Sequence, residues 1–182
     1  MSSGGKALQL HNSYLIAQTD DGLVIIDQHA LHERVIFEEL LTRIARGPLE
    51  SQRLLIPITL SASSRQCELL EQIQPLLGKL GIEASVWGPG SVAVQGFPSF
   101  LHRLDPGEFI RELLEKGEQE LLDLTEEQLL HEVLDMMACK AAVKAGDRMS
   151  GDELRALLDL REDVERSSNC PHGRPTTVRI TI

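Results

Sequence analysis

The feature of this sequence that most constrains its fold is an abrupt change of hydrophobic period at Asp27-Gln28. Residues 12–19 and 23–27 are rich in Val, Ile, Leu and Tyr, and they flank the turn signal Asp20-Asp21-Gly22, so they predict a β-hairpin. From Gln28 onward the apolar residues recur at helical spacing, until Gly47-Pro48 ends the helix at about Arg46. The chain is therefore expected to pass from a strand into a helix at Asp27.

The remaining pattern predicts further strands and helices in a mixed order. An extended segment at 51–61 precedes a helix at 63–80, with Ser63 and Gln66 as a capping box, and Pro75 could kink or divide this helix. The later elements are strands at 82–87 and 91–97, a helix from Asp105 to about Gly117, helices at 125–145 and 150–166, a loop at 167–175 and a final strand at 176–182.

This order predicts an α/β fold of the α+β type with two lobes. Residues 1–48 and 120–182 would form one outer lobe from both chain ends, and residues 50–118 would form a smaller inserted α/β lobe.

Charge and composition exclude several classes of protein. Subtracting 28 acidic from 18 basic residues gives a net charge of −10, and residues 105–135 hold eleven acids and two bases, which excludes a strongly basic DNA-binding domain. No apolar run approaches the roughly 20 residues that span a bilayer, and the sequence opens without a secretory signal. Three widely spaced cysteines argue against a disulfide scaffold. We therefore expect a cytoplasmic protein with no membrane partner.

The segment after the predicted hairpin carries candidate metal ligands. His29 and Glu33 are four residues apart, which places them about 40° apart on one helix face, with Asp27 just before them. His32 lies about 60° from His29 and suits an outer position, whereas Glu38 lies about 140° from Glu33 and is a poor ligand. The alternative interpretation is a solvated His–Glu pair on an exposed face.

A second group of candidate ligands follows in the loop at 167–175. Cys170 and His172 would point to the same side of an extended stretch, and Arg174 could hold a phosphate or a carboxylate. Thiolate, imidazole and carboxylate together suit zinc, and the carboxylates would also accept manganese or magnesium. Alone, a Cys-x-His pair is usually structural.

Three motifs in the chain resemble those of MutL-type mismatch-repair endonucleases. Asp27-Gln-His-Ala-x-x-Glu33-x-x-x-x-Glu38 matches the family's first motif over its whole length. Ala138-Cys139-Lys140 and Cys170-Pro-His-Gly-Arg-Pro175 match the second and third, in the same order. The sequence thus resembles the C-terminal domain of a MutL protein without its N-terminal ATPase. Family members usually continue beyond the third motif into a further helix, whereas this sequence stops at Ile182, so it is either truncated there or belongs to a shorter branch.

The resemblance implies roles for individual residues. It makes Asp27, His29, Glu33, Cys170 and His172 the metal site for Zn²⁺ and Mn²⁺ or Mg²⁺, with Asp27 and Glu33 catalytic. It places Cys139, Arg174 and Glu38 near that site. The family domain dimerises, nicks DNA and carries an inserted regulatory lobe, and ATP would act only through the N-terminal domain. Cys67 matches no motif and is expected in the core.

The resemblance also predicts partners. Gln52, Leu55 and Pro57 fit the Q-x-x-L-x-P pattern by which the family binds the replication sliding clamp, as a peptide docks in a groove. The expected partners are a second copy of the chain, double-stranded DNA (held weakly by this domain alone), the sliding clamp and, in the full-length protein, a mismatch-recognition protein. A bacterial cytoplasmic location, at the nucleoid during repair, follows from the same family.

Two other functions remain open from the sequence. The chain could be a non-catalytic dimerisation and recruitment module with a structural zinc, whose site would be closed by four protein ligands. It could also be an unrelated metallohydrolase, although no substrate-pocket signal supports that reading.

Overall fold

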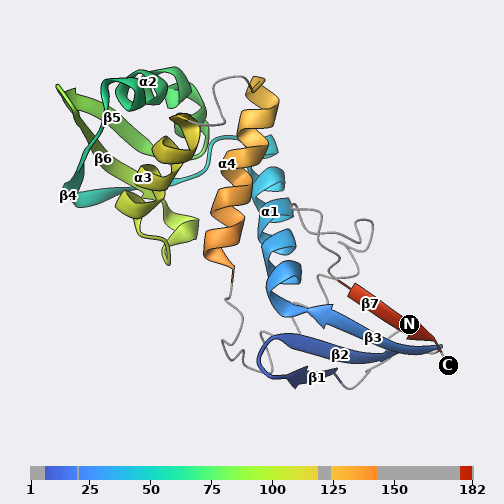
Figure 1. Ribbon diagram of the computed structural model, residues 1–182. Coiled ribbons are helices and arrows are strands. Elements are labelled where there is room, and N and C mark those ends of the chain that lie inside the picture. The colour runs from blue at the N-terminus through green and yellow to red at the C-terminus, as the bar shows by residue number, and fades with distance from the viewer. Residues whose placement is uncertain (1–6, 20, 119–123, 143–176, 182) are drawn as a thin grey trace. The chain divides into compact units, whose positions relative to one another are not determined.

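A computed structural model describes residues 7–19, 21–118, 124–142 and 177–181 of the chain. It contains two antiparallel sheets and four α-helices in this part of the sequence, which confirms a mixed α/β fold consistent with α+β (Figure 1). By its internal contacts the chain divides into two compact units, residues 1–39 with 141–182 and residues 40–140. The predicted lobe boundaries at 48, 50, 118 and 120 stay predictions.

The first unit is built on a four-stranded sheet in the order β1-β2-β3-β7. Its strands are β1 (Ala7–Leu10), β2 (Tyr14–Thr19), β3 (Gly22–Asp27) and β7 (Thr177–Thr181). The predicted hairpin is confirmed as β2 and β3, and the final strand as β7. Gly22 has φ +152°, and a Cβ on it would lie 2.0 Å from the carbonyl oxygen of Ile180, so the close approach of β7 requires glycine there.

Strand β1 was not predicted, because residues before Asn12 gave no clear signal. It forms a tight hairpin with β2, in which Ser13 N–H donates to the Leu10 carbonyl oxygen at 3.1 Å. His11 and Asn12, the two central residues, both have φ +51°, as a type I′ turn requires. The Ala-Leu-Gln-Leu alternation and the asparagine were the available signals.

Helix α1 (Gln28–Arg46) begins at the residue after β3, as the period change predicted (Figure 1). Both its start and its end agree with the sequence pattern. Arg43 and Arg46 lie in its last turn, where positive charge is favourable beside the unpaired carbonyl groups.

The second unit contains a three-stranded sheet in the order β4-β6-β5. Its elements are β4 (Ser51–Ser61), α2 (Ser64–Lys79), β5 (Glu83–Gly88), β6 (Ser91–Pro98), the short 3₁₀ helix η1 (Ser99–Leu101), α3 (Pro106–Lys116) and α4 (Glu126–Ala141). Helix α2 contacts β5, α3 contacts β4 and β6, and the two helices contact each other. Their apolar faces, together with Val92 and Val94 of β6, form the core of this unit.

The predicted helix caps of this unit are present. Ser63 and Gln66 form the capping box of α2, Asp105 accepts from Glu108 N–H at 2.7 Å, and Thr125 and Gln128 cap α4. Pro75 lies inside α2, which runs unbroken past it. Helix α4 ends at Ala141, four residues before the predicted end. The predicted helix at 150–166 and the loop at 167–175 lie outside the described residues.

One surface ion pair links α2 to α4 within the second unit. Lys79 Nζ donates to Glu126 Oε1 at 2.7 Å, and this hydrogen bond and the lysine charge lower the pKa of Glu126. The ion pair therefore contributes to the stability of the second unit at pH values above the ordinary pKa of a glutamate. This contribution is lost as the pH falls through the lowered pKa of Glu126.

Candidate functional site

The candidate site is built around Asp27, which is both the last residue of β3 and the residue before α1. Its Oδ1 accepts a hydrogen bond from Ala30 N–H at 3.0 Å, the pattern of an N-cap aspartate. Tyr14 of β2 is its partner across the sheet, so the strand register fixes the backbone on one side and the cap fixes the side chain on the other. Oδ2 takes no part in the cap hydrogen bond. The carboxylate is therefore held at a set position with one oxygen committed to the helix.

His29 and Glu33 lie on one face of α1, as predicted. His29 Nε2 is 3.7 Å from Glu33 Oε2, with the histidine side chain 33% and the glutamate side chain 5% exposed. A buried carboxylate requires a compensating positive charge or metal, and the predicted alternative of a solvated surface pair does not fit a glutamate so little exposed. The first turns of α1 thus hold a buried carboxylate and a half-buried imidazole close together.

Two further residues of α1, Glu38 and His32, lie outside the His29–Glu33 pair. Glu38 forms an ion pair with Arg34, four residues earlier on the same helix, and the guanidinium of Arg34 lies 5.7 Å from the centre of the Phe37 ring. This engagement agrees with the expectation that Glu38 is a poor direct ligand. His32 is half-buried one residue before Glu33.

The other residues singled out from the sequence, which include the predicted ligands Cys170 and His172, belong to later parts of the sequence. Cys170, His172 and Arg174 are outside the described residues, so their roles stay predictions. Cys139 is half-buried near the end of α4, in the second unit. Cys67 is half-buried on α2 rather than in the core, because it lies beside the buried stripe formed by Leu69, Leu70 and Ile73.

One face of the four-stranded sheet is apolar and exposed. Side chains at paired positions of neighbouring strands point to the same face, and Leu8 pairs with Ile16, Ile16 with Ile25, and Ile25 with Val178. The large exposed apolar residues of this face, which we call the apolar sheet face, are Leu8, Leu10, Tyr14, Leu23, Val178 and Ile180. Residues of the opposite parity, Leu15, Val24 and Ile26, are at most 1% exposed. The sheet therefore has one core face and one face suited to a partner.

The segment Gln52–Pro57 lies within β4 and interrupts its pairing. Arg53 pairs with Gly96 and Ile58 with Val94, so the four residues 54–57 of β4 stand opposite the single residue Gln95 of β6. Gln52, Leu55 and Pro57, the predicted clamp-binding residues, are all exposed. Leu55 is 103% and Ile56 79% exposed, so two neighbouring aliphatic side chains stand out from the bulge.

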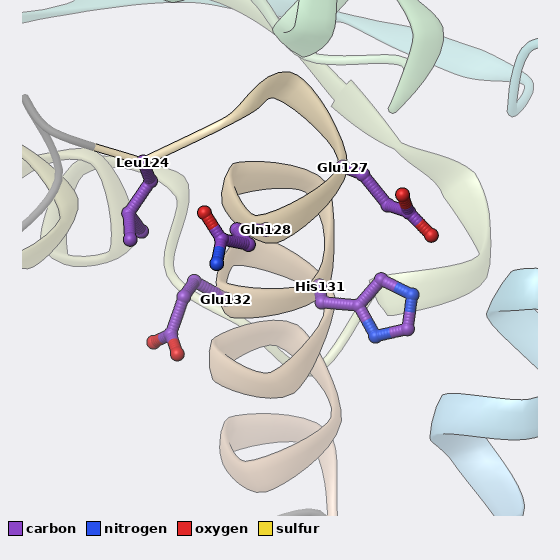
Figure 2. Close-up of a pocket in the computed structure, with 5 residues that line it drawn as sticks. All are labelled: Leu124, Glu127, Gln128, His131 and Glu132. Atoms are coloured by element: carbon purple, nitrogen blue, oxygen red, sulfur yellow. The ribbon is translucent and has the colours of Figure 1, made fainter.

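A pocket of about 350 Å³ lies along the first turns of α4 (Figure 2). Leu124, Glu127, Gln128, His131 and Glu132 line it, and none of these was a predicted site residue. Figure 2 shows Glu127 and His131 on one side of the helix and Glu132 on the other. Glu132 Oε2 accepts from Lys116 Nζ at 2.8 Å, so this carboxylate already has a role inside the unit.

Several residues with a place in the site escaped the sequence reasoning. Leu8 and Leu10 were missed because β1 was missed, and their alternation with Gln9 was the signal that could have identified them. Ile56 was missed because the clamp pattern gives its position no preference. Gln28 belongs to the first motif, but the sequence assigns it no role of its own; it is 1% exposed and thus buried as deeply as the core.

The geometry defines a class of protein: a mixed α/β domain with a candidate metal centre at a strand-to-helix junction and an exposed apolar sheet face. A family model described as the MutL C terminal dimerisation domain matches residues 7–149. The chain belongs to this family of dimerisation domains from MutL mismatch-repair proteins. The resemblance read from the three motifs is thereby confirmed.

Curated relatives are similar in sequence to this chain along almost its whole length. The DNA mismatch repair protein MutL of Bradyrhizobium sp. (strain ORS 278) is 39% identical over 181 residues, which cover 98% of this chain and 29% of that protein. The protein of the same description from Rhodopseudomonas palustris (strain BisB18) is 40% identical over 181 residues, covering 98% and 30%. That from Phenylobacterium zucineum (strain HLK1) is 35% identical over 179 residues, covering 98% and 29%. The chain thus spans less than a third of the length of these relatives. No helix in the described part of the chain is both long and apolar enough to cross a membrane.

The N-cap role of Asp27 gives a stability prediction for the metal-free protein. Asp27→Ala should lower the free energy of unfolding by about 0.5–2 kcal/mol, whereas Asp27→Asn should change it little, because asparagine caps a helix as well as aspartate does. Urea denaturation in the presence of a chelator measures both values. Asp105→Ala, which removes the cap of α3, is the matched control and should cost a similar amount. Equal destabilisation by Asp27→Asn and Asp27→Ala would contradict the capping role.

Proposed function

We propose that this chain is the metal-dependent, DNA-nicking endonuclease domain of a MutL mismatch-repair protein, and that it also pairs two subunits and binds the replication sliding clamp. The observation that carries the proposal is the junction itself: a capped Asp27, followed within two turns of helix by an imidazole and a buried carboxylate. Glu33 is 3% exposed and lies beside His29, a setting that suits a bound cation better than a solvated surface pair.

The side chains at the junction fit a divalent metal. Asp27 and Glu33 supply oxygen donors and His29 a nitrogen donor, a set that suits Zn²⁺ and, through the carboxylates, Mn²⁺ or Mg²⁺. Cys170 and His172 would complete the site and favour zinc for at least one ion. A bound metal would lower the pKa of a water molecule and offset charge on the scissile phosphate.

The residues of the chain have distinct tasks in this proposal. Asp27 presents a carboxylate whose orientation the cap to Ala30 fixes, so it is the residue that we assign to the catalytic ion. Glu33 places its negative charge in a buried setting where a cation interacts strongly with it. Glu38 acts at a distance, because Arg34 engages its carboxylate. Arg174 would contact a phosphate of the DNA, and Cys139 would lie near the metal.

The charge of the chain supports delivery of the nuclease by other proteins. A net charge of −10 gives little attraction to the DNA backbone, so we expect weak DNA binding by this domain alone. The exposed pair Leu55 and Ile56 would dock in an apolar groove of the sliding clamp, with Gln52 forming hydrogen bonds and Pro57 limiting the freedom of the segment. In the full-length protein, ATP would act through the N-terminal domain and a mismatch-recognition protein would direct the nicking.

The apolar sheet face is the surface that we assign to the second subunit. It is formed by all four strands of the first unit, and an apolar patch of this kind on one face of a sheet commonly pairs with its own copy about a two-fold axis. The family name, a dimerisation domain, supports the same assignment.

A second candidate function is a non-catalytic dimerisation and recruitment module with a structural zinc. The apolar sheet face and the family description favour it as much as they favour the nuclease. The two functions differ in what metal loss does: a structural zinc would be needed for folding, whereas a catalytic ion could leave with the fold intact.

Nicking of supercoiled plasmid in Mn²⁺ tests the proposal directly. Wild-type protein should nick, and Asp27→Asn should lower the rate about 100-fold or more, because loss of an outer contact of a metal site already costs 10–100-fold. Asp105→Asn makes the same chemical change at another helix cap and should nick as wild type does. If Asp27→Asn nicks like wild type, Asp27 is not catalytic; if the wild type stays inactive and unfolds on removal of zinc, the structural module is correct.

Pairing through the apolar sheet face predicts a charge-sensitive dimer. Val178→Asp would bury an unpaired carboxylate in the interface, so the dimer Kd should rise about 100-fold or more. Thr181→Asp places the same charge on the opposite face of the same strand and should leave the Kd nearly unchanged. Sedimentation equilibrium measures both constants. Equal effects of the two substitutions would place the dimer interface elsewhere.

The clamp contact predicts a local loss of binding. Leu55→Asp should raise the Kd for purified sliding clamp about tenfold or more, which corresponds to about 1.4 kcal/mol, because it removes an aliphatic side chain that would be buried on docking. Thr59→Asp, at an exposed position of β4 beyond the bulge, is the control. Surface plasmon resonance on immobilised clamp reads out both variants. Unchanged binding by Leu55→Asp would remove the Gln52–Pro57 segment from the proposal.

A further inference from the structure

A buried glutamine ties the first hairpin of the sheet to the start of the site helix. Gln28, the first residue of α1, is 1% exposed, and its Oε1 accepts a hydrogen bond from Gln9 Nε2 of β1 at 2.6 Å. Its backbone N–H donates to the carbonyl oxygen of Ser13, in the β1–β2 turn, at 2.9 Å. A buried polar side chain must be hydrogen-bonded, so the position of Gln28 depends on where the hairpin lies.

Gln28 stands between two residues of the candidate metal site. Asp27 precedes it and His29 follows it, so a shift of Gln28 moves the backbone that carries both. Figure 1 shows the β1–β2 turn and the first turn of α1 at the same end of the sheet, in agreement with the pairing of Tyr14 with Asp27. The hairpin therefore positions the first turn of α1 through two hydrogen bonds from different parts of Gln28.

The same hairpin contributes to the apolar sheet face. In β1, Leu8 and Leu10 point to that face, and Gln9 between them points to the other side, toward Gln28. Strand β1 is an edge strand and pairs with β2 alone among the described strands. An edge hairpin has little stability of its own, so a partner that covers Leu8 and Leu10 would hold β1 in place.

We propose that Gln28 is a positioning residue that couples dimer formation to metal binding. A partner that covers the apolar sheet face fixes the position of β1, and the Gln9–Gln28 hydrogen bond then restricts the positions of Asp27 and His29. The inference rests on the proposed metal site and dimer face, and it adds the link between them. Because coupling between two binding events is reciprocal and each of the two subunits carries one coupled metal site, saturating metal should tighten the dimer by the square of the factor by which the dimer tightens metal binding at each site.

The test measures Mn²⁺ affinity by isothermal titration calorimetry in a dimer and in a monomer. The dimer is the wild type, and the monomer is Val178→Asp, whose change lies on β7 at the opposite edge of the sheet from β1. The wild type should bind Mn²⁺ about fivefold or more tightly than the monomer. Sedimentation with and without saturating Mn²⁺ should change the dimer Kd by the square of this factor, because each dimer holds two coupled sites.

Gln9→Met removes the hydrogen bond with little change in side-chain size. Introduced into the wild type and into Val178→Asp, it should reduce the ratio of the dimer's Mn²⁺ affinity to the monomer's to within about twofold. Gln28→Met is the second variant, and the double variant should lose no more coupling than either single one, as expected for one shared interaction. A merely structural role for the pair would lower the melting temperature and leave the ratio unchanged.

The outcomes separate the coupling from the function on which it rests. Equal Mn²⁺ affinity in the wild type and the monomer, or an unchanged ratio in both Gln→Met variants, would overturn the coupling while leaving the metal site standing. A wild type that binds neither Mn²⁺ nor Zn²⁺ would overturn the metal site, and the coupling with it.

Discussion

The hydrogen bond from Ala30 N–H to the Asp27 carboxylate is the interaction on which the candidate site depends. Asp27 ends a strand and caps a helix, so no loop lies between the two elements. Without a loop, the directions of β3 and α1 are linked, and helical geometry places His29 and Glu33 on one face of α1. The cap costs the site little, because an aspartate has a second oxygen that the helix does not use.

The two faces of the sheet in the first unit have different roles. One face packs Leu15, Val24 and Ile26 into the core, whereas the other carries the exposed side chains of the apolar sheet face. Successive side chains of a β-strand point to opposite faces of the sheet, so this division follows from strand geometry. Gln9 of β1 is a half-buried polar exception on the core face, and its hydrogen bond to the buried Gln28 of α1 satisfies one polar group of each side chain.

Much of this structure could be predicted from local sequence. The hairpin at Asp20-Asp21-Gly22, helix α1 and the caps at Ser63, Asp105 and Thr125 followed from turn residues, hydrophobic period and side chains that bond to their own neighbours. His29 and Glu33 could be placed on one helix face for the same reason.

Features that depend on distant partners could not be predicted in this way. Strand β1 is short, and it exists because β2 pairs with it. The burial of Glu33 and Gln28 depends on what surrounds the helix, and period alone does not show it. The bulge in β4 arises from a mismatch with β6, which is more than thirty residues away in the sequence. Cys170 and His172, which the motif resemblance joins to the site, lie outside the described residues.

The bulge in β4 also bears on the solubility of the protein. Leu54-Leu55-Ile56 is a run of aliphatic residues on an edge strand, the kind of segment that recruits a strand from another molecule into a growing aggregate. Here the bulge breaks the regular spacing of the backbone donors and acceptors, and Pro57 supplies no donor at all. Strand β4 can therefore expose two large aliphatic side chains while the backbone of residues 54–57 offers no regular edge for uncontrolled β-pairing.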